Sequence, residues 1–213
     1  MFEKNAMNTM AMLFCYGAVM TGTAFLMYRI SDSRVFTLTG FIWLAAAVLT
    51  LFLNRKLPFE NPVESSGRSL RKGQEALVAV LGAVILIAAQ FLTRFFETAM
   101  LHLPAVSANS ARLAGELRQG AGFFLSICIA GPIFEELVYR KVIFGNLSAL
   151  LPKTLCALLS SALFSLSHMD GHLLVYGIQG LIFCSIYALS GRIRTSMAAH
   201  MLMNTVAVAT WLL

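Results

Sequence analysis

The sequence is short of charged residues. Lys, Arg, Asp and Glu make up 12% of the 213 residues and hydrophobic residues make up 58%, whereas about 25% charged is usual for a soluble domain. An ordinary soluble protein is therefore excluded, and an integral membrane protein is indicated. The net charge of +6 does not indicate nucleic-acid binding, because the basic residues fall in particular loops, as membrane orientation requires. The length allows one helical bundle and no sizeable soluble domain.

Cysteine is also scarce, and its spacing resembles no metal site. We expect small hydrophobic side chains rather than disulfides or ligands, because every cysteine lies inside an apolar run. The sequence has no internal repeat and no low-complexity tract. The four cysteines are Cys15, Cys128, Cys156 and Cys184.

Long apolar runs are abundant. Each approaches the roughly 20 residues that cross the hydrocarbon core as a helix, so we predict an all-α, polytopic transmembrane helical bundle of about seven spans. The first run could be a signal peptide, since it offers small residues at 22–24, but it is longer than a typical signal core and we favour a retained anchor. The runs are about 7–28, 35–53, 76–96, 121–147, 153–170, 172–190 and 195–213.

The distribution of Lys and Arg predicts the orientation. With the N-terminus inside, the inner stretches hold eleven of the sixteen basic residues, five of them in the loop between the second and third spans. This favours a cytoplasmic N-terminus and an outer C-terminus. We expect residues 1–120 to supply N-terminal anchoring spans with a cytoplasmic basic loop, and 121–213 to form a catalytic core. Compactness and the lack of an organelle signal favour a prokaryotic plasma membrane.

Two adjacent carboxylates in the fourth apolar run are the most informative feature. Ionisable groups at membrane depth are expensive and usually face a protein interior or a water-filled cavity. Glu136 and Arg140 are four residues apart, so they share a helix face and should pair. Glu135 points elsewhere and lacks this partner, which makes it the better candidate for a general base. The alternative is a structural charge cluster at the inner membrane interface.

Histidine follows in the fifth run. His168 lies one helical turn after Phe164, and an intramembrane histidine can be either a helix–helix hydrogen-bond donor or a catalyst. Glu135 lies about 18 Å from the turn near Leu147, and His168 lies about 24 Å along the returning helix, at 1.5 Å per residue. Two antiparallel helices could therefore bring the side chains together.

The last run carries a second polar pair. His200 and Asn204 are four residues apart and project to one side of the helix, where two donors would suit an oxyanion site. They could instead bond to backbone carbonyls of a neighbouring helix. His200 lies only five residues into the expected span, which would place it shallower than His168.

His172 forms a His-x-x-x-His spacing with His168 that could serve zinc. Asp170 and Gly171 favour a turn between them, so we do not expect His172 to be a ligand.

The three elements together resemble the signature of the CPBP family, the Abi or CAAX prenyl endopeptidase-like intramembrane proteases. The elements are EExxxR at 135–140, FxxxH at 164–168 and HxxxN at 200–204, each in its own apolar run and in the family's order. The resemblance covers about 121–213, nearly half of the chain. It implies a helical bundle whose last four spans surround a water-accessible cavity.

The resemblance also implies roles. Glu135 and His168 would activate a water for peptide-bond hydrolysis, while His200 and Asn204 would stabilise the oxyanion. Glu136 and Arg140, with Phe164, would support the site. The family is often described as metalloproteases, and Glu135, His168 and His200 could bind zinc or another divalent metal. We favour no cofactor, because Asn is an uncommon zinc ligand and HExxH is absent.

Other functions are compatible with these buried polar residues. Buried carboxylates and histidines also build proton relays in transporters, although the sequence has no repeated halves. A non-catalytic membrane adaptor or bacteriocin-immunity protein of the same fold is a further alternative. The expected partners are the lipid bilayer and a membrane-associated peptide or protein substrate, not nucleic acid. A prenylated C-terminus, a pheromone precursor, a bacteriocin leader and a membrane-protein segment are all compatible substrates, and the oligomeric state is open.

Overall fold

The computed structural model describes residues 2–212, which fold into helices and connecting turns without strands. Residues Ala121–Ala149 form one continuous helix, the central helix, of which α6 (Gly131–Glu135) is the middle part. The other helices are α1 (Phe2–Arg29), α2 (Arg34–Lys56), α3 (Pro62–Ser66), α4 (Lys72–Leu101), α5 (Ala108–Gln119), α7 (Lys153–Ser167), α8 (Leu173–Ser190) and α9 (Ile193–Leu212).

Each of the seven expected apolar runs forms a helix, which confirms an all-helical membrane bundle. Five helices are long and apolar enough to cross a membrane: α1, α2, α4, the central helix and α8. Helix α7 is apolar but has 15 residues. The exact number of spans stays a prediction.

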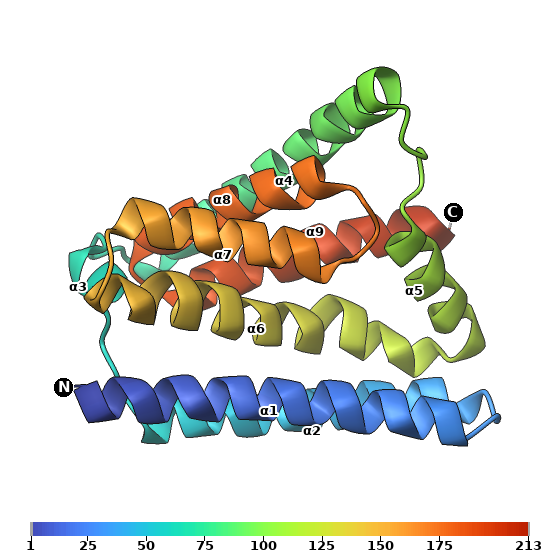
Figure 1. Ribbon diagram of the computed structural model, residues 1–213, viewed down its shortest axis with the longest axis horizontal. Coiled ribbons are helices and arrows are strands. Elements are labelled where there is room, and N and C mark those ends of the chain that lie inside the picture. Colours follow the sequence, from blue (N-terminus) through green and yellow to red (C-terminus); the bar gives the residue numbers. More distant parts are fainter. Residues whose placement is uncertain (1, 213) are drawn as a thin grey trace.

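The helices pack in layers around the central helix (Figure 1). The α1–α2 hairpin covers one side, and α7, α8, α9 and α4 lie on the other. Of the most apolar window of the central helix, 67% is buried, against 17% for α1 and 28% for α2. The helix that carries the paired glutamates is therefore enclosed by protein on most of its surface, as its charge requires.

Helices α7 and α8 approach closely where their side chains are small. A Cβ at Gly180 would lie 2.8 Å from the Cα of Ser161, so only glycine permits this separation. The four cysteines are free, and three of them are buried. They are small core side chains, as expected.

The turn between α7 and α8 breaks the helix at the expected place. Met169 and Gly171 have φ angles of 53° and 84°, and Gly171 adopts this left-handed conformation at little cost. His168 and His172 therefore lie on different elements. At α5, the N-cap is Ser107, whose hydroxyl accepts from the backbone N–H of Ser110.

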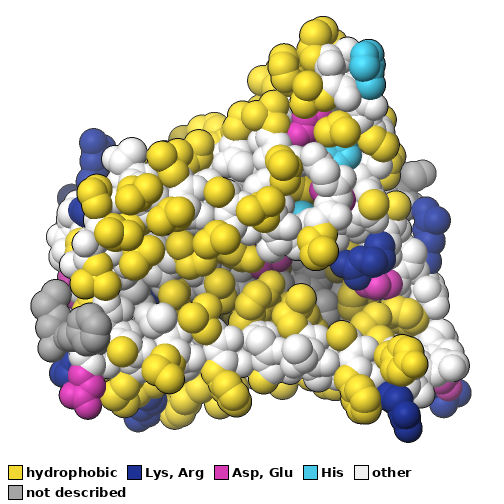
Figure 2. Space-filling model, in the orientation of Figure 1, with side chains coloured by type: hydrophobic (Ala, Val, Ile, Leu, Met, Phe, Trp, Pro, Cys, Tyr) yellow, Lys and Arg dark blue, Asp and Glu magenta, His cyan; other side chains and the backbone are white. Residues whose placement is uncertain are grey.

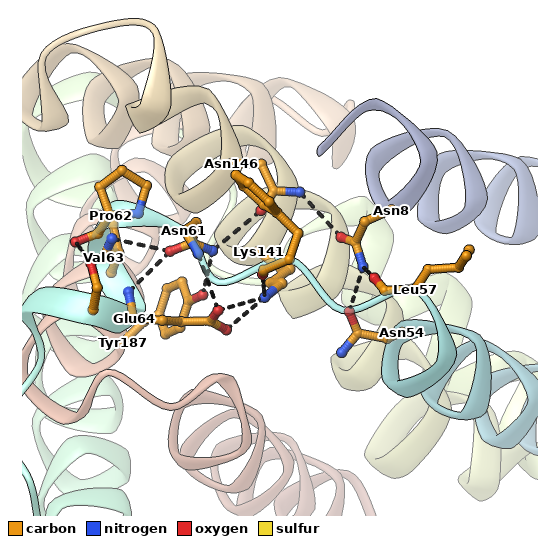
Figure 3. Close-up of polar contacts among 12 residues, drawn as sticks. Asn8, Asn54, Leu57, Asn61, Pro62, Val63, Glu64, Lys141, Asn146 and Tyr187 are labelled. Atoms are coloured by element: carbon orange, nitrogen blue, oxygen red, sulfur yellow. Dashed lines mark hydrogen bonds and ion pairs between the residues drawn. The ribbon is translucent and has the colours of Figure 1, made fainter. Parts of the chain in front are cut away.

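A polar network ties α1, α2, α3, α8 and the central helix together at the end that holds the N-terminus (Figure 3). The Asn61 amide donates to Asn146 and to the Tyr187 hydroxyl, at 3.2 and 3.0 Å. Lys141 donates to Glu64 at 2.6 and 2.7 Å. Each buried polar group here has a partner, so the network joins the hairpin to the core without an uncompensated desolvation cost.

Hydrophobic side chains cover the middle of the molecule, and most Lys and Arg side chains lie toward its two ends (Figure 2). Such a belt between two charged rims is the surface that a bilayer requires.

Candidate active site

The central helix departs from α geometry on both sides of the glutamates. Residues Ser126–Ala130 and Glu136–Asn146 are wound as π-helix, with α6 between them. In a π segment each carbonyl accepts from the N–H five residues later, as Ser126 does from Gly131. The next carbonyl, that of Ile127, would need the N–H that Pro132 lacks. π-helical turns occur frequently at functional sites.

Asn204 supplies the missing donor. Its side-chain amide nitrogen lies 2.9 Å from the carbonyl oxygen of Ile127. This is the alternative considered from the sequence, a bond to a neighbouring backbone. The second amide hydrogen remains free to serve the cavity, which Asn204 also lines.

Glu136 is wholly buried and is held by three side chains. The Arg140 guanidinium lies 3.6 Å away, which confirms the predicted pair. Ser196 donates its hydroxyl to one carboxylate oxygen at 2.5 Å, and His200 Nδ1 lies 3.0 Å from the other. A carboxylate with these partners is fixed in position and suits a supporting role.

Aromatic rings enclose Arg140. Its guanidinium carbon lies 4.3 Å from the ring centre of Phe164 and 4.7 Å from that of Phe183, within the range of cation–π attraction. Phe183 also packs on His200, with ring centres 4.4 Å apart. The phenylalanine of FxxxH therefore contacts both the arginine and, one turn later, His168.

Glu135 occupies a different environment. Its side chain is 26% exposed, and one oxygen lies 3.5 Å from His200 Nε2. His200 thus lies between the two glutamates, one at each ring nitrogen. The shorter contact to Glu136 fixes the ring, and Nε2 is left to exchange a proton or a hydrogen bond with Glu135 or a ligand.

The imidazole of His168 has a defined orientation. Its Nδ1 lies 2.8 Å from the carbonyl oxygen of Phe164, and since a carbonyl only accepts, Nδ1 must carry the proton. The neutral ring then presents an unprotonated Nε2. Tyr176 stacks on the ring at 3.7 Å and 17°, and its hydroxyl donates to Asp170 at 2.9 Å.

A cavity of about 440 Å³ brings these groups together. Its wall includes Glu135, His168, His200 and Asn204 from three different segments. Although His200 was expected to lie shallower than His168, both line this cavity, and His200 Nε2 lies beside Glu135. Helices α1, α2, α4, α5 and α8 complete the wall, so the first half of the chain contributes to the site.

The donor set does not converge on a metal. Among the described residues, no group of three or more His, Cys, Asp and Glu side chains could hold a metal ion. The trio suggested from the sequence, Glu135, His168 and His200, lines one cavity but does not form such a group.

His172 has a structural partner. Its Nδ1 lies 2.7 Å from a carboxylate oxygen of Glu97, and both side chains are 1% exposed. The other oxygen of Glu97 accepts from the backbone of Leu174 and Val175. Glu97 therefore caps the start of α8, where a helix has free N–H groups.

Sequence reasoning missed four contributors: Glu97, Tyr176, Phe183 and Ser196. Only Ser196 carried a signal, because it lies four residues before His200 and so extends the polar face of α9 to Ser-x-x-x-His-x-x-x-Asn. The other three reach the site from two other helices, Glu97 from α4 and Tyr176 and Phe183 from α8, through contacts that no sequence spacing shows.

Comparison with known proteins identifies a family for the part of the chain that holds most of this site. Residues 118–206 match the family described as type II CAAX prenyl endopeptidase Rce1-like. No solved structure matches the chain significantly.

Two bacterial proteins are similar over most of the chain. "Putative membrane peptidase YdiL" of Bacillus subtilis (strain 168) is 30% identical over 167 residues, which are 78% of this chain and 68% of that protein. "Membrane-embedded CAAX protease MroQ" of Staphylococcus aureus (strain USA300) is 28% identical over 181 residues, 81% and 72% of the two chains. This chain therefore belongs to the Rce1-like family of CAAX-type membrane endopeptidases, and is an integral membrane peptide hydrolase.

Proposed function

We propose that the protein is a glutamate-dependent intramembrane endopeptidase, which cleaves a membrane-associated peptide or protein by activating a water between Glu135 and His168. The observation that carries the proposal is the contrast between the two glutamates. Glu136 is fully enclosed by Arg140, Ser196 and His200, whereas Glu135 faces the cavity. Glu136 therefore suits a supporting role, and Glu135 can reach a substrate.

In this mechanism Glu135 takes a proton from the water, and the Nε2 lone pair of His168 accepts a hydrogen bond that orients it. The resulting hydroxide adds to the carbonyl carbon of the scissile bond. His200 Nε2–H and the second amide hydrogen of Asn204 donate to the oxyanion. Glu135 then returns its proton to the leaving amine, and the C–N bond breaks.

Charge supports this assignment. Glu136 accepts from His200 Nδ1, and the imidazolium form of the ring is the one that also donates from Nε2. Arg140 balances Glu136 in turn. The buried carboxylate and guanidinium therefore act on the reaction through His200, without touching the substrate.

The test is cleavage of a quenched membrane-peptide library by the purified protein, comparing wild type with Glu135→Gln, each with and without a chelator. Cleavage by the wild type that is lost in the variant and survives the chelator would support the proposal. Loss with chelator would make a metal part of the reaction. No cleavage by a folded wild type would favour a non-catalytic adaptor of the same fold.

A further inference from the structure

The catalytic cavity lies in one half of the bundle. Every long helix that lines it does so with the part nearest α5: the second half of α1, the first half of α2, the second half of α4, the first half of the central helix and the second half of α9. The α7–α8 turn and α5 complete this end. The stretches that contain the lining residues are 16–27, 39–43, 87–94, 109–116, 123–135, 164–179 and 200–211.

The opposite half is closed by paired polar groups. Beyond Glu135 the central helix continues with the buried Glu136 and Arg140, and then reaches the network of Lys141, Asn146 and Asn61 (Figure 3). Among the described residues of this network, none lines the cavity. Water and substrate therefore reach Glu135 from the α5 end.

A second closure lies at the same end, between α4 and α9. Glu75 pairs with Arg192 at 2.9 Å and with Arg194 at 2.7 Å. These arginines, together with Lys141 and the basic loop around α3, belong to the stretches that hold eleven of the sixteen basic residues. Since basic loops stay in the cytoplasm, the closed end is the cytoplasmic one.

We infer that the active site opens to the non-cytoplasmic face, so that the substrate is a membrane-anchored polypeptide whose scissile bond is presented from the outer side of the bilayer. The identity of the reaction rests on the proposed function, but the direction of opening does not. A polypeptide that exposes the bond only to the cytoplasm would have to pass the Glu136–Arg140 layer.

The test is the reactivity of single cysteines, introduced into a chain whose four native cysteines are replaced by alanine. Ser110→Cys and Ala207→Cys place a thiol on two walls of the cavity, and Ser65→Cys places one on α3 as the matched control. Intact and permeabilised spheroplasts are treated with a charged, membrane-impermeant thiol reagent. We expect both cavity thiols to react in intact spheroplasts, and the α3 thiol to react only after permeabilisation.

Labelling of the cavity thiols only after permeabilisation would overturn the inference, as would labelling of the α3 thiol from the same side as the cavity thiols. A parallel assay presents a cleavable bond on the inner or the outer side of an anchored peptide, with wild type and Glu135→Gln. If the cavity thiols are labelled in intact spheroplasts but no peptide is cleaved, the proposed function is refuted and the direction of opening is still supported. The two hypotheses can therefore fail separately.

Discussion

At the residue scale, the clearest division is between side chains that face the cavity and side chains that hold them. Ser196 belongs to the second class, because its hydroxyl donates to Glu136 and not to any group in the cavity wall. Ser196→Ala should lower kcat roughly tenfold or more and leave KM nearly unchanged, since a hydrogen bond to a charged group is lost behind the site. Steady-state kinetics on a cleaved peptide measures this.

Ser185→Ala is the control for that variant. Ser185 is exposed on α8 and donates to the carbonyl of Leu181 within its own helix, so kinetics should be unchanged. An equal loss of kcat in the two variants would show that Ser196 affects the reaction only through the general stability of the protein.

Asn204 has an observed structural contact and a proposed catalytic role, and the two can be separated. Asn204→Ala leaves the carbonyl of Ile127 without a donor, at a cost of about 1–3 kcal/mol, and removes an oxyanion donor. In a Pro132→Ala background the restored backbone N–H at position 132 can satisfy that carbonyl. Thermal unfolding of the four members of this double-mutant cycle should show the stability loss shrinking in the Pro132→Ala background.

A loss of stability that is equal in both backgrounds would contradict the assignment of Asn204 to the gap left by Pro132. Loss of kcat that persists in the Pro132→Ala background, by about 10²–10³-fold, is the expected signature of the oxyanion donor.

At the element scale, the α7–α8 turn is held by groups outside the motifs. Glu97→Ala should destabilise the protein by about 3–5 kcal/mol, because His172 loses its buried partner and α8 loses its N-terminal acceptor. Unfolding in detergent followed by circular dichroism measures the change. Glu60→Ala, at an exposed carboxylate before α3, is the control, and an equally small effect for both would refute a capping role for Glu97.

Some of the helices, turns and side-chain pairs could be predicted from the sequence, and others could not. The helices of the seven apolar runs follow from hydrophobicity and length. The Glu136–Arg140 pair follows from helical spacing, and the turn after His168 follows from Gly171. The π winding around Pro132, the cap at Ser107 and the buried Glu97–His172 pair do not, because each depends on which helix lies alongside. The sequence spacing shows that His200 and Asn204 share a helix face. Only the packing of α9 against the central helix shows that His200 lies between two glutamates.

At the scale of the whole molecule, the N-terminal hairpin is joined to the catalytic half through side-chain amides. Asn61 accepts from two backbone N–H groups of α3 and donates to Asn146 and Tyr187. Asn61→Ala should loosen this end and speed proteolysis between α2 and α4, because several bonds worth about 1 kcal/mol each are lost together. Ser65→Ala, which removes one long bond of 3.4 Å, should leave the digestion rate unchanged; equal rates for the two variants would argue against the network.

The central claim is that Glu135 performs the chemistry and Glu136 supports it. The most direct test is the rate of cleavage of one identified peptide by wild type and by Glu135→Gln, with the unfolding temperature of each measured in parallel. The account predicts a variant that unfolds like the wild type and loses activity by about 10²–10⁴-fold, the usual contribution of a general base. A folded Glu135→Gln protein that cleaves at close to the wild-type rate would contradict it.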